Sequence, residues 1–162
     1  MQQPRIVEIE RKLMAGHCIT TSLAENATFS LWSKFRAQES AIKNKLNTDL
    51  YSVEIFEKDL DFRDFTPQTQ FEKWAAVEVS DLDSVPEGMK KLTIEAGLYA
   101  VFIHHGPARA FPQTAQYIHG QWMPQSGYQL DDRPHFEIMT GDYKGPNHPE
   151  AEEEIWVPIK KK

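Results

Sequence analysis

The sequence predicts an α+β fold made of two pseudo-symmetric β-α-β-β modules, which form an antiparallel sheet with one helix in each half. The first observation behind this prediction is an internal repeat. Trp74 and Trp156, like Glu72 and Glu154, are about 82 residues apart in a chain of 162. The second is the order of the hydrophobic patterns, which reads strand, helix, strand, strand in each half. A repeat of this length is a duplicated supersecondary unit, so the fold is predicted half by half.

Other matches at nearly the same offset extend the repeat along the chain. They are Phe29 with Phe111, Phe35 with Tyr117, Ala15-Gly16 with Ala96-Gly97, and Glu54-Ile55 with Glu137-Ile138. We therefore expect a single domain over residues 1–162, with repeat halves at about 5–80 and 90–160. Two related halves that pack together leave a central groove, and such a seam is a common place for a small-molecule pocket.

In the first half, apolar alternation and runs of β-forming residues predict strands, and a change to helical spacing predicts one helix. The expected strands are residues 5–11, 18–21, 50–57 and 73–79. Asn26 or Thr28 is expected to cap the helix. The apolar stripe of this helix consists of Phe29, Trp32, Phe35 and Ile42.

The second half repeats this order. Its expected strands are residues 91–95, 98–105, 136–139 and 155–159. Pro112 fits the first turn of the helix, while Pro124 and Gly127 are expected to end it. The apolar stripe of this helix consists of Phe111, Ala115, Ile118 and Trp122.

Composition narrows the class of protein. With 40% hydrophobic residues, the chain is long enough to bury a core. A net charge of −6 argues against a nucleic-acid surface, which needs a basic stripe. Cys18 is the single cysteine, and neither an apolar signal core nor a run of membrane-spanning length is present, so we expect a cytoplasmic protein. The glycines are scattered rather than gathered in a phosphate-binding loop, and no cofactor is predicted.

Alternation along the strands predicts which side chains share a face of the sheet. In the last strand, Ile155, Val157 and Ile159 form the face that a helix would cover, and Glu154 and Trp156 lie on the other. If the helices cover one side of the sheet, the uncovered side brings carboxylates beside large apolar side chains. The residues expected there are Glu54, Glu72, Glu137 and Glu154 with Trp74, Trp156, Phe56 and Met139.

A concave surface of aromatic rings with one or two carboxylates favours flat, hydrophobic, cationic ligands. Cation–π attraction contributes about 0.5–2 kcal/mol per contact, and a partly desolvated carboxylate adds a counter-charge. The alternative interpretation is that the Trp residues cap the sheet edge and the Glu residues are solvated. No metal site is predicted, because His104 and His105 point to opposite faces, and His135 with Glu137 supplies too few ligands.

Five segments of the second half form a specific combination. They are AGLYAVF (96–102), HG (105–106), QWMPQSGY (121–128), RPHFEI (133–138) and EIWVPI (154–159). Together they closely resemble the GyrI-like small-molecule-binding domain, also called the AraC-type bacterial effector-binding domain. The first half resembles the N-terminal repeat of this family in its order and length. The resemblance implies two modules related by pseudo-two-fold symmetry with a ligand groove between them, and it implies that Glu154 meets cationic ligands.

The resemblance implies three kinds of function, of which we favour binding of a hydrophobic, cationic or planar small molecule, as in effector-binding domains of multidrug-sensing transcription regulators. The pattern begins near residue 5 and ends at Ile159, so we expect no DNA-binding module and no direct DNA binding. The alternative is a hydrolase of reactive electrophilic natural products, with a groove Glu and Tyr as acid, base or hydrogen-bond donor. A third is a gyrase-inhibitor-like interaction protein, so a regulator or gyrase is a possible partner. The predicted ligand-binding residues are Glu154, Trp156, Trp74, Glu137, Trp122, Phe56 and Met139, and the catalytic candidates are Glu154 or Glu137 with Tyr99, Tyr51 or Tyr128.

Overall fold

The computed structural model of the protein describes residues 2–162. Its strands are β1 (Arg5–Ile9), β2 (Lys12–Thr21), β3 (Leu50–Ile55), β4 (Phe71–Glu78), β5 (Lys90–Ile94), β6 (Gly97–His105), β7 (Tyr128–Leu130), β8 (His135–Met139) and β9 (Glu152–Lys161). Its α-helices are α1 (Thr28–Gln38), α2 (Phe111–Tyr117) and α3 (Met123–Gln125), with a π-helical turn η4 (Ile118–Trp122) joining the last two. Short 3₁₀ turns are η1 (Glu39–Ala41), η2 (Phe62–Asp64) and η3 (Ala108–Ala110).

The strands of residues 2–162 form one nine-stranded antiparallel sheet in the order β1-β6-β9-β8-β3-β4-β2-β5, with β7 paired to β9. Strands β3 and β8 are neighbours at its centre, so the two halves of the sequence meet along this pair. Helix α1 packs against β2 and β4, and the segment from α2 to α3 covers β6 and β9. The predicted α+β fold with antiparallel pairing and one helical segment per half is therefore confirmed.

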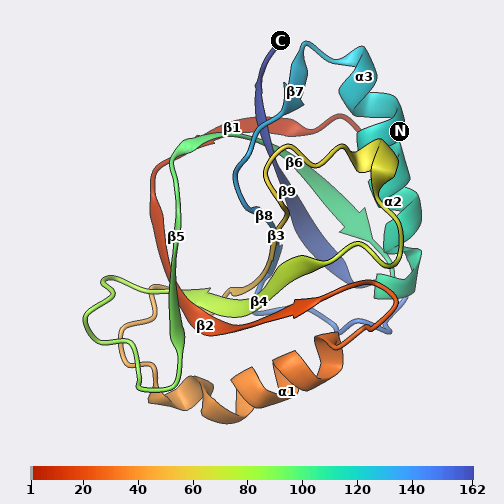
Figure 1. The fold of residues 1–162 in the computed structure, drawn as a ribbon. Helices are drawn as coiled ribbons and strands as arrows, with labels where there is room; N and C mark the ends of the chain where they lie inside the picture. Colours follow the sequence, from red (N-terminus) through yellow and green to blue (C-terminus); the bar gives the residue numbers. More distant parts are fainter. Residues whose placement is uncertain (1) are drawn as a thin grey trace.

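Each half contributes its first strand to the other half. Strand β1 pairs with β6 rather than with β2, and β5 pairs with β2 rather than with β6. The strands consequently form an incomplete ring (Figure 1). Strands β1 and β5 lie on different sides of this ring, and α1 and the segment from α2 to α3 lie outside it. The two exchanged pairs have equivalent registers. In the first pair Ile9 of β1 lies opposite Gly97 of β6, and in the second pair Leu92 of β5 lies opposite Met14 of β2.

These registers correct one match of the predicted repeat. Gly97 begins β6, whereas Gly16 lies in the middle of β2, opposite Ala76. A Cβ atom at Gly16 would lie 2.0 Å from the Ala75 carbonyl oxygen, so close approach of β4 requires glycine there. The two Ala-Gly dipeptides therefore do not occupy equivalent positions, although the strands β2 and β6 are equivalent to each other.

The core is divided by the sheet into three clusters. In the first cluster, Leu31 and Phe35 of α1, with Ile42 just after η1, pack on side chains of β2 and β4. In the second cluster, Ile118 of η4 and Met123 of α3 pack on side chains of β6 and β9. We call the side of the sheet that carries these two clusters the outer face. The opposite side, the inner face, carries the third cluster, which consists of Ile9, Met14, Tyr51, Val53, Trp74, Ala76, Ile94, Tyr99, Val101, Phe136, Ile138 and Trp156.

Three local predictions were wrong at the helices. Phe29 does not join the buried stripe of α1, since 85% of it is exposed. The residue at the N-cap of α1 is Ala27, which provides no side-chain cap, so neither Asn26 nor Thr28 serves that role. Pro124 does not end the second helical segment but lies in the first turn of α3, where a missing N–H is tolerated.

Candidate functional site

The inner face carries the same pair of side chains twice. The indole Nε1 of Trp74 donates to Oε1 of Glu72 at 2.5 Å, and the indole Nε1 of Trp156 donates to Oε1 of Glu154 at 3.1 Å. In each case the two residues are i and i+2 of one strand, which places them on one face. The predicted association of Glu154 with Trp156, and of Glu72 with Trp74, is confirmed. We call each Trp–Glu pair a half-site.

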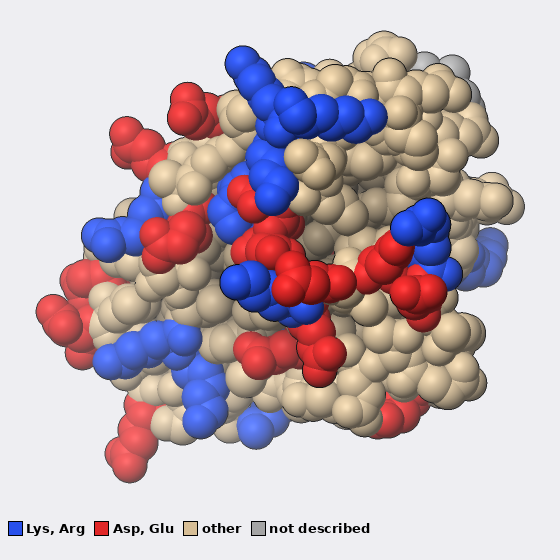
Figure 2. Space-filling view, turned by 45° about the horizontal axis from the view of Figure 1, so that its top comes forward, with Lys and Arg blue, Asp and Glu red and all other residues tan. Residues whose placement is uncertain are grey.

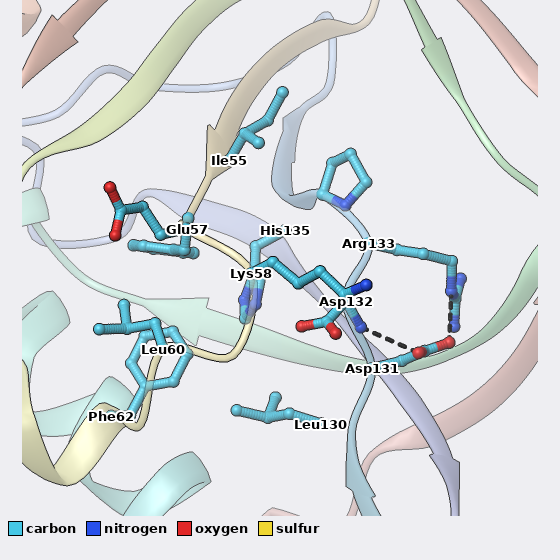
Figure 3. Close-up of a pocket in the computed structure, with 12 residues that line it drawn as sticks. Ile55, Glu57, Lys58, Leu60, Phe62, Leu130, Asp131, Asp132, Arg133 and His135 are labelled. Carbon is cyan, nitrogen blue, oxygen red and sulfur yellow. Dashed lines mark hydrogen bonds and ion pairs between the residues drawn. The ribbon is translucent and has the colours of Figure 1, made fainter.

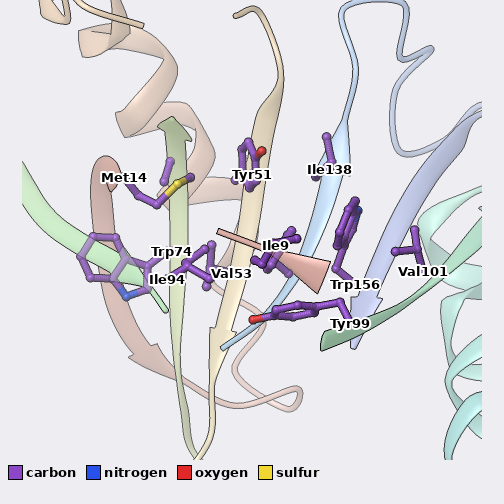
Figure 4. Close-up of a cluster of buried hydrophobic side chains, with 12 residues drawn as sticks. Ile9, Met14, Tyr51, Val53, Trp74, Ile94, Tyr99, Val101, Ile138 and Trp156 are labelled. Atoms are coloured by element: carbon purple, nitrogen blue, oxygen red, sulfur yellow. The ribbon is translucent and has the colours of Figure 1, made fainter. Parts of the chain in front are cut away.

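An aromatic stack adjoins the second half-site. The Phe136 ring stacks on Trp156 at 5.3 Å between centroids with an interplanar angle of 15°. The Tyr99 ring lies 5.1 Å from Phe136 and 6.0 Å from Trp156, and the Tyr51 ring lies 5.5 Å from Phe136. Trp74 projects from the other half, on the far side of Val53 from Trp156 in Figure 4. The two halves thus place large aromatic side chains on one buried surface.

Two further carboxylates, Asp49 and Glu78, lie near Glu154 of the second half-site. We call Asp49, Glu78 and Glu154 the acidic rim. The Tyr51 hydroxyl donates to Glu78 at 3.4 Å, and the ammonium group of Lys12 lies 3.5 Å from the same carboxylate. The guanidinium of Arg5 lies 3.2 Å from Glu154. Burial raises the pKa of Asp49, and the negative charges of Glu154 and Glu78 raise it further. One face of the molecule shows acidic side chains gathered near its centre with basic ones beside them (Figure 2).

Two members of the acidic rim were missed by the sequence analysis. Glu78 follows Glu72, Trp74 and Ala76 at a spacing of two, so the alternation of β4 contained the signal for it. Asp49 and Arg5, the ion-pair partner of Glu154, carried no comparable signal. Their proximity to Glu154 depends on the pairing of β1 with β6 and of β3 with β8.

The structure corrects the predicted face of the central strands. Val53 lies opposite Trp74, and Phe136 lies opposite Trp156, so these residues share the inner face. Glu54 and Glu137 consequently project from the outer face, together with Met139. The alternation within β3 and β8 was read correctly, but the side of the sheet was wrong. Neither Glu137 nor Met139 is placed beside the two Trp residues.

On the outer face, Glu54 and Glu137 belong to a buried polar group. Oε2 of Glu54 accepts hydrogen bonds from the Ser52 hydroxyl at 3.2 Å and from the Lys73 ammonium at 3.0 Å. Burial raises the pKa of Glu137 well above its usual range, and the neighbouring charge of Glu54 raises it further. Burial lowers the pKa of Lys73, but the charges of Glu54 and Glu137 outweigh this effect and leave it raised. We call Ser52, Glu54, Lys73 and Glu137 the polar group.

Phe56 belongs to a separate aromatic cluster rather than to the inner face. Its ring lies 5.0 Å from Phe62 and 5.0 Å from His135. The His119 ring stacks on Phe62 at 4.9 Å. Burial lowers the pKa of His119 to about 4 and that of His135 to about 3, so both imidazoles are neutral near pH 7. His135 is thus held by rings and not by Glu137.

A cavity of about 450 Å³ borders this aromatic cluster. It lies between the end of β3 and the segment that leads into β8, and its lining includes Ile55, Phe62, Leu130, Arg133 and His135 (Figure 3). Ile55 also packs against the inner-face cluster. One wall of the cavity is therefore shared with the buried surface that carries Trp74 and Trp156.

Two further predicted residues have other partners. Trp122 packs on the outer face, where its ring lies 5.3 Å from Phe102 and stacks on Tyr128 at 6.2 Å, so it does not join the other Trp residues. The Tyr99 hydroxyl donates to the Pro134 carbonyl at 2.7 Å, and its ring is covered by the Arg133 guanidinium at 4.7 Å. Tyr99 lies on the inner face with Glu154, but its hydroxyl points to a backbone carbonyl. The hydrolytic role of Tyr99 together with Glu154 stays a prediction.

Over the part of the chain that the structure describes, no three His, Cys, Asp or Glu side chains are arranged to hold a metal ion. Every helix within residues 2–162 is too short or too polar to cross a lipid bilayer.

Comparison with known protein families gives one match over nearly the whole chain. Residues 2–160 match the GyrI-like family, described as a GyrI-like small molecule binding domain. The transcriptional regulator BrlR of Pseudomonas aeruginosa is 27% identical over 155 residues, which are 96% of this chain and 54% of the regulator. The chain thus spans about half the length of this curated relative.

Solved structures show the same fold. SAV2435 bound to tetraphenylphosphonium superposes with a TM-score of 0.73 at 18% identity, covering 98% of this chain and 94% of that one. The C-terminal domain of EcmrR superposes with a TM-score of 0.73 at 16% identity, covering 99% and 98%.

Proposed function

The chain belongs to the GyrI-like family of small-molecule-binding domains, which relates it to the effector-binding domains of transcription regulators, and we propose that its ligand is a hydrophobic cation held on the inner face. In this proposal Trp74 and Trp156 provide the walls, and Glu154 provides the counter-charge. The observation that supports it best is the duplicated half-site, in which a carboxylate accepts the indole N–H two residues along the same strand.

The chemistry of the inner face suits such a ligand. Aromatic faces attract a cation by about 0.5–2 kcal/mol per contact, and the stack of Phe136 and Trp156 offers apolar area beside them. The acidic rim holds three carboxylates against the two cations Arg5 and Lys12, and this excess of negative charge favours a cationic ligand. A charge in a partly desolvated site attracts its partner more strongly than it would in water.

Access to the inner face requires movement, because Trp74 and Trp156 are only 4% and 8% exposed. The cavity beside Ile55 is the natural place for a ligand to begin separating the two halves, since its wall is shared with the inner-face cluster. The ligand would then replace contacts between side chains with contacts to its own rings. Tetraphenylphosphonium, the compound bound by SAV2435, has the required charge and rings and is the natural test compound.

The test is calorimetric titration of tetraphenylphosphonium into the protein and into Glu154→Gln. We expect binding to the native protein and an affinity about tenfold lower in the variant, which corresponds to about 1.4 kcal/mol of lost ionic attraction. At 100 times its dissociation constant, the compound should also stabilise the fold by about 2.7 kcal/mol.

Glu150→Gln is the matched control, because Glu150 also pairs with a cation, Lys144 at 3.4 Å, but in an exposed loop. Its affinity should equal that of the native protein. Equal binding to Glu154→Gln and to the native protein would show that Glu154 is not the counter-charge. Absence of binding to the native protein would remove the proposed ligand class.

A further inference from the structure

The two half-sites differ in their counter-ions. At Glu154, Oε1 accepts from Trp156 and Oε2 from Arg5, so both carboxylate oxygens have a partner. At Glu72, Oε1 accepts from Trp74, and none of the ion pairs within residues 2–162 involves this carboxylate. Within residues 2–162, an ion pair therefore forms at one half-site only.

The exchange of first strands places Arg5 at the second half-site. Arg5 lies opposite Val101 in the pairing of β1 with β6, and Val101 lies opposite Trp156. The equivalent pairing of β5 with β2 ends at Lys90 opposite Gly16, two residues before Cys18, which lies opposite Trp74. Burial raises the pKa of Cys18, the charge of Glu72 raises it further and the charge of Lys90 lowers it, so Lys90 acts near the first half-site without the ion pair that Arg5 makes in the second.

The backbone around Arg5 is fixed while its side chain remains in contact with solvent. Oε1 of Gln2 accepts from the Ile103 N–H at 2.7 Å, and the Gln2 carbonyl accepts from the Tyr117 hydroxyl at 2.8 Å. Ile103 is itself opposite Glu154, so this anchor holds the start of β1 beside the carboxylate. The Arg5 side chain is 61% exposed and the Glu154 side chain 29% exposed. The guanidinium can leave Glu154 without any change in the sheet.

We propose that Arg5 is an internal competitor for the cation site, occupying Glu154 until a cationic ligand displaces it. This inference rests on the proposed function, since it concerns the same carboxylate. Exposed ion pairs are weak, so Arg5 can be displaced at modest cost. When only a fraction of molecules has the binding-competent arrangement, the apparent affinity falls by that fraction. Arg5 thereby raises the apparent dissociation constant of every cationic ligand by the same factor, so only ligands that gain further affinity from the aromatic rings still bind tightly.

The test compares two ions of the same shape and opposite charge, tetraphenylphosphonium and tetraphenylborate, by calorimetric titration. In Arg5→Gln we expect tetraphenylphosphonium to bind about two- to sixfold more tightly than it binds the native protein, the range set by a weak exposed pair. Tetraphenylborate should bind no more tightly. In about 1 M salt, where the screening length is about 3 Å, the gain should shrink.

Arg36→Gln is the matched control, because Arg36 forms an ion pair of the same 3.2 Å length with Glu39 and is 57% exposed, but on α1. It removes the same charge and should leave both affinities unchanged. Arg5→Lys keeps a cation at the site and should also stay close to the native affinity. In the double variant Arg5→Gln with Glu154→Gln, the gain should disappear, because no carboxylate is left to be uncovered.

Three outcomes decide the question. A gain for the cation alone, dependent on Glu154, supports the inference. If the native protein binds tetraphenylphosphonium through Glu154 but Arg5→Gln binds it equally, Arg5 is only a structural partner of the edge strand, and the proposed function stands. If neither protein binds tetraphenylphosphonium, both proposals are overturned. Circular dichroism and the melting temperature of Arg5→Gln establish that the compared proteins are folded.

Discussion

The two faces of the central strands β3 and β8 are both buried, yet they are built from opposite kinds of residue. The inner face presents Val53 and Phe136, each less than 1% exposed, between Trp74 and Trp156. The outer face presents Ser52, Glu54 and Glu137, at 6%, 9% and 8% exposure. The comparison shows that burial at the centre of this sheet does not imply an apolar surface, and that each face is stabilised in a different way.

The energetic consequences differ accordingly. The inner face is stabilised by burial of apolar area, which is non-directional and tolerates separation of the rings by another apolar group. The polar group on the outer face depends on one cation, Lys73, which faces Glu54 and Glu137 and also feels the charge of Glu153. Removing the cation from such a group leaves a buried negative charge without a partner. Replacements on the two faces should therefore change the free energy of unfolding by different amounts and for different physical reasons.

The largest effect is expected on the inner face, from Phe136→Ala. Phe136 stacks on Trp156 and also contacts Tyr51 and Tyr99, so truncation should leave a cavity and lower the free energy of unfolding by about 3–5 kcal/mol. Urea denaturation measures this change. Phe29→Ala is the control, because Phe29 is 85% exposed, and its unfolding free energy should change by less than about 0.5 kcal/mol. A small effect of Phe136→Ala would mean that the aromatic stack contributes little.

The next effect belongs to the outer face and concerns Lys73→Met. Without the ammonium group, Glu54 and Glu137 share a buried site with no counter-charge, and the unfolding free energy should fall by about 3 kcal/mol. Lys45→Met is the matched control. Lys45 lies the same 3.0 Å from Glu39, but this pair is more exposed, so its loss should cost less than about 1 kcal/mol. Equal costs for the two variants would remove the distinction between the buried and the exposed pair.

Much of this architecture could be predicted from the sequence. The repeat gave the two modules, and period-two alternation placed Glu154 with Trp156 and Glu72 with Trp74. Alternation also separated Glu137 from Phe136 correctly, but it could not tell which set faces the two Trp residues. That choice depends on the registers Val53 to Trp74 and Phe136 to Trp156, which are contacts between distant strands.

Arg5 shows the same limit at the candidate site. Nothing near residue 5 in the sequence points to Glu154, because β1 follows the pattern of an ordinary edge strand. Its role depends on the exchange of first strands, which places it in the other half of the sheet. The sequence reports local periodicity, which could have included Glu78, whereas Arg5 and Asp49 are positioned by long-range pairing and could not be found in this way.

The smallest effect, and the one most specific to the polar group, is expected from Glu137→Gln. The pKa of Glu137 is raised in the folded protein, so between its ordinary value of about 4.5 and the raised value the folded state binds more protons than the unfolded state. The native protein should therefore lose stability as the pH rises through this window. Glutamine keeps the shape, can donate its amide N–H to Glu54, and removes the proton dependence.

The variant should match the native protein in unfolding free energy near pH 4.5 and exceed it by about 1 kcal/mol at pH 8, because one unpaired charge no longer has to be buried beside Glu54. Denaturation in urea at several pH values measures the difference. Glu150→Gln, which alters a carboxylate in an exposed loop, should show no such divergence. If Glu137→Gln were less stable than the native protein at pH 8, the second carboxylate would be a stabilising partner of Lys73, and the outer face would be balanced by charge rather than by a retained proton.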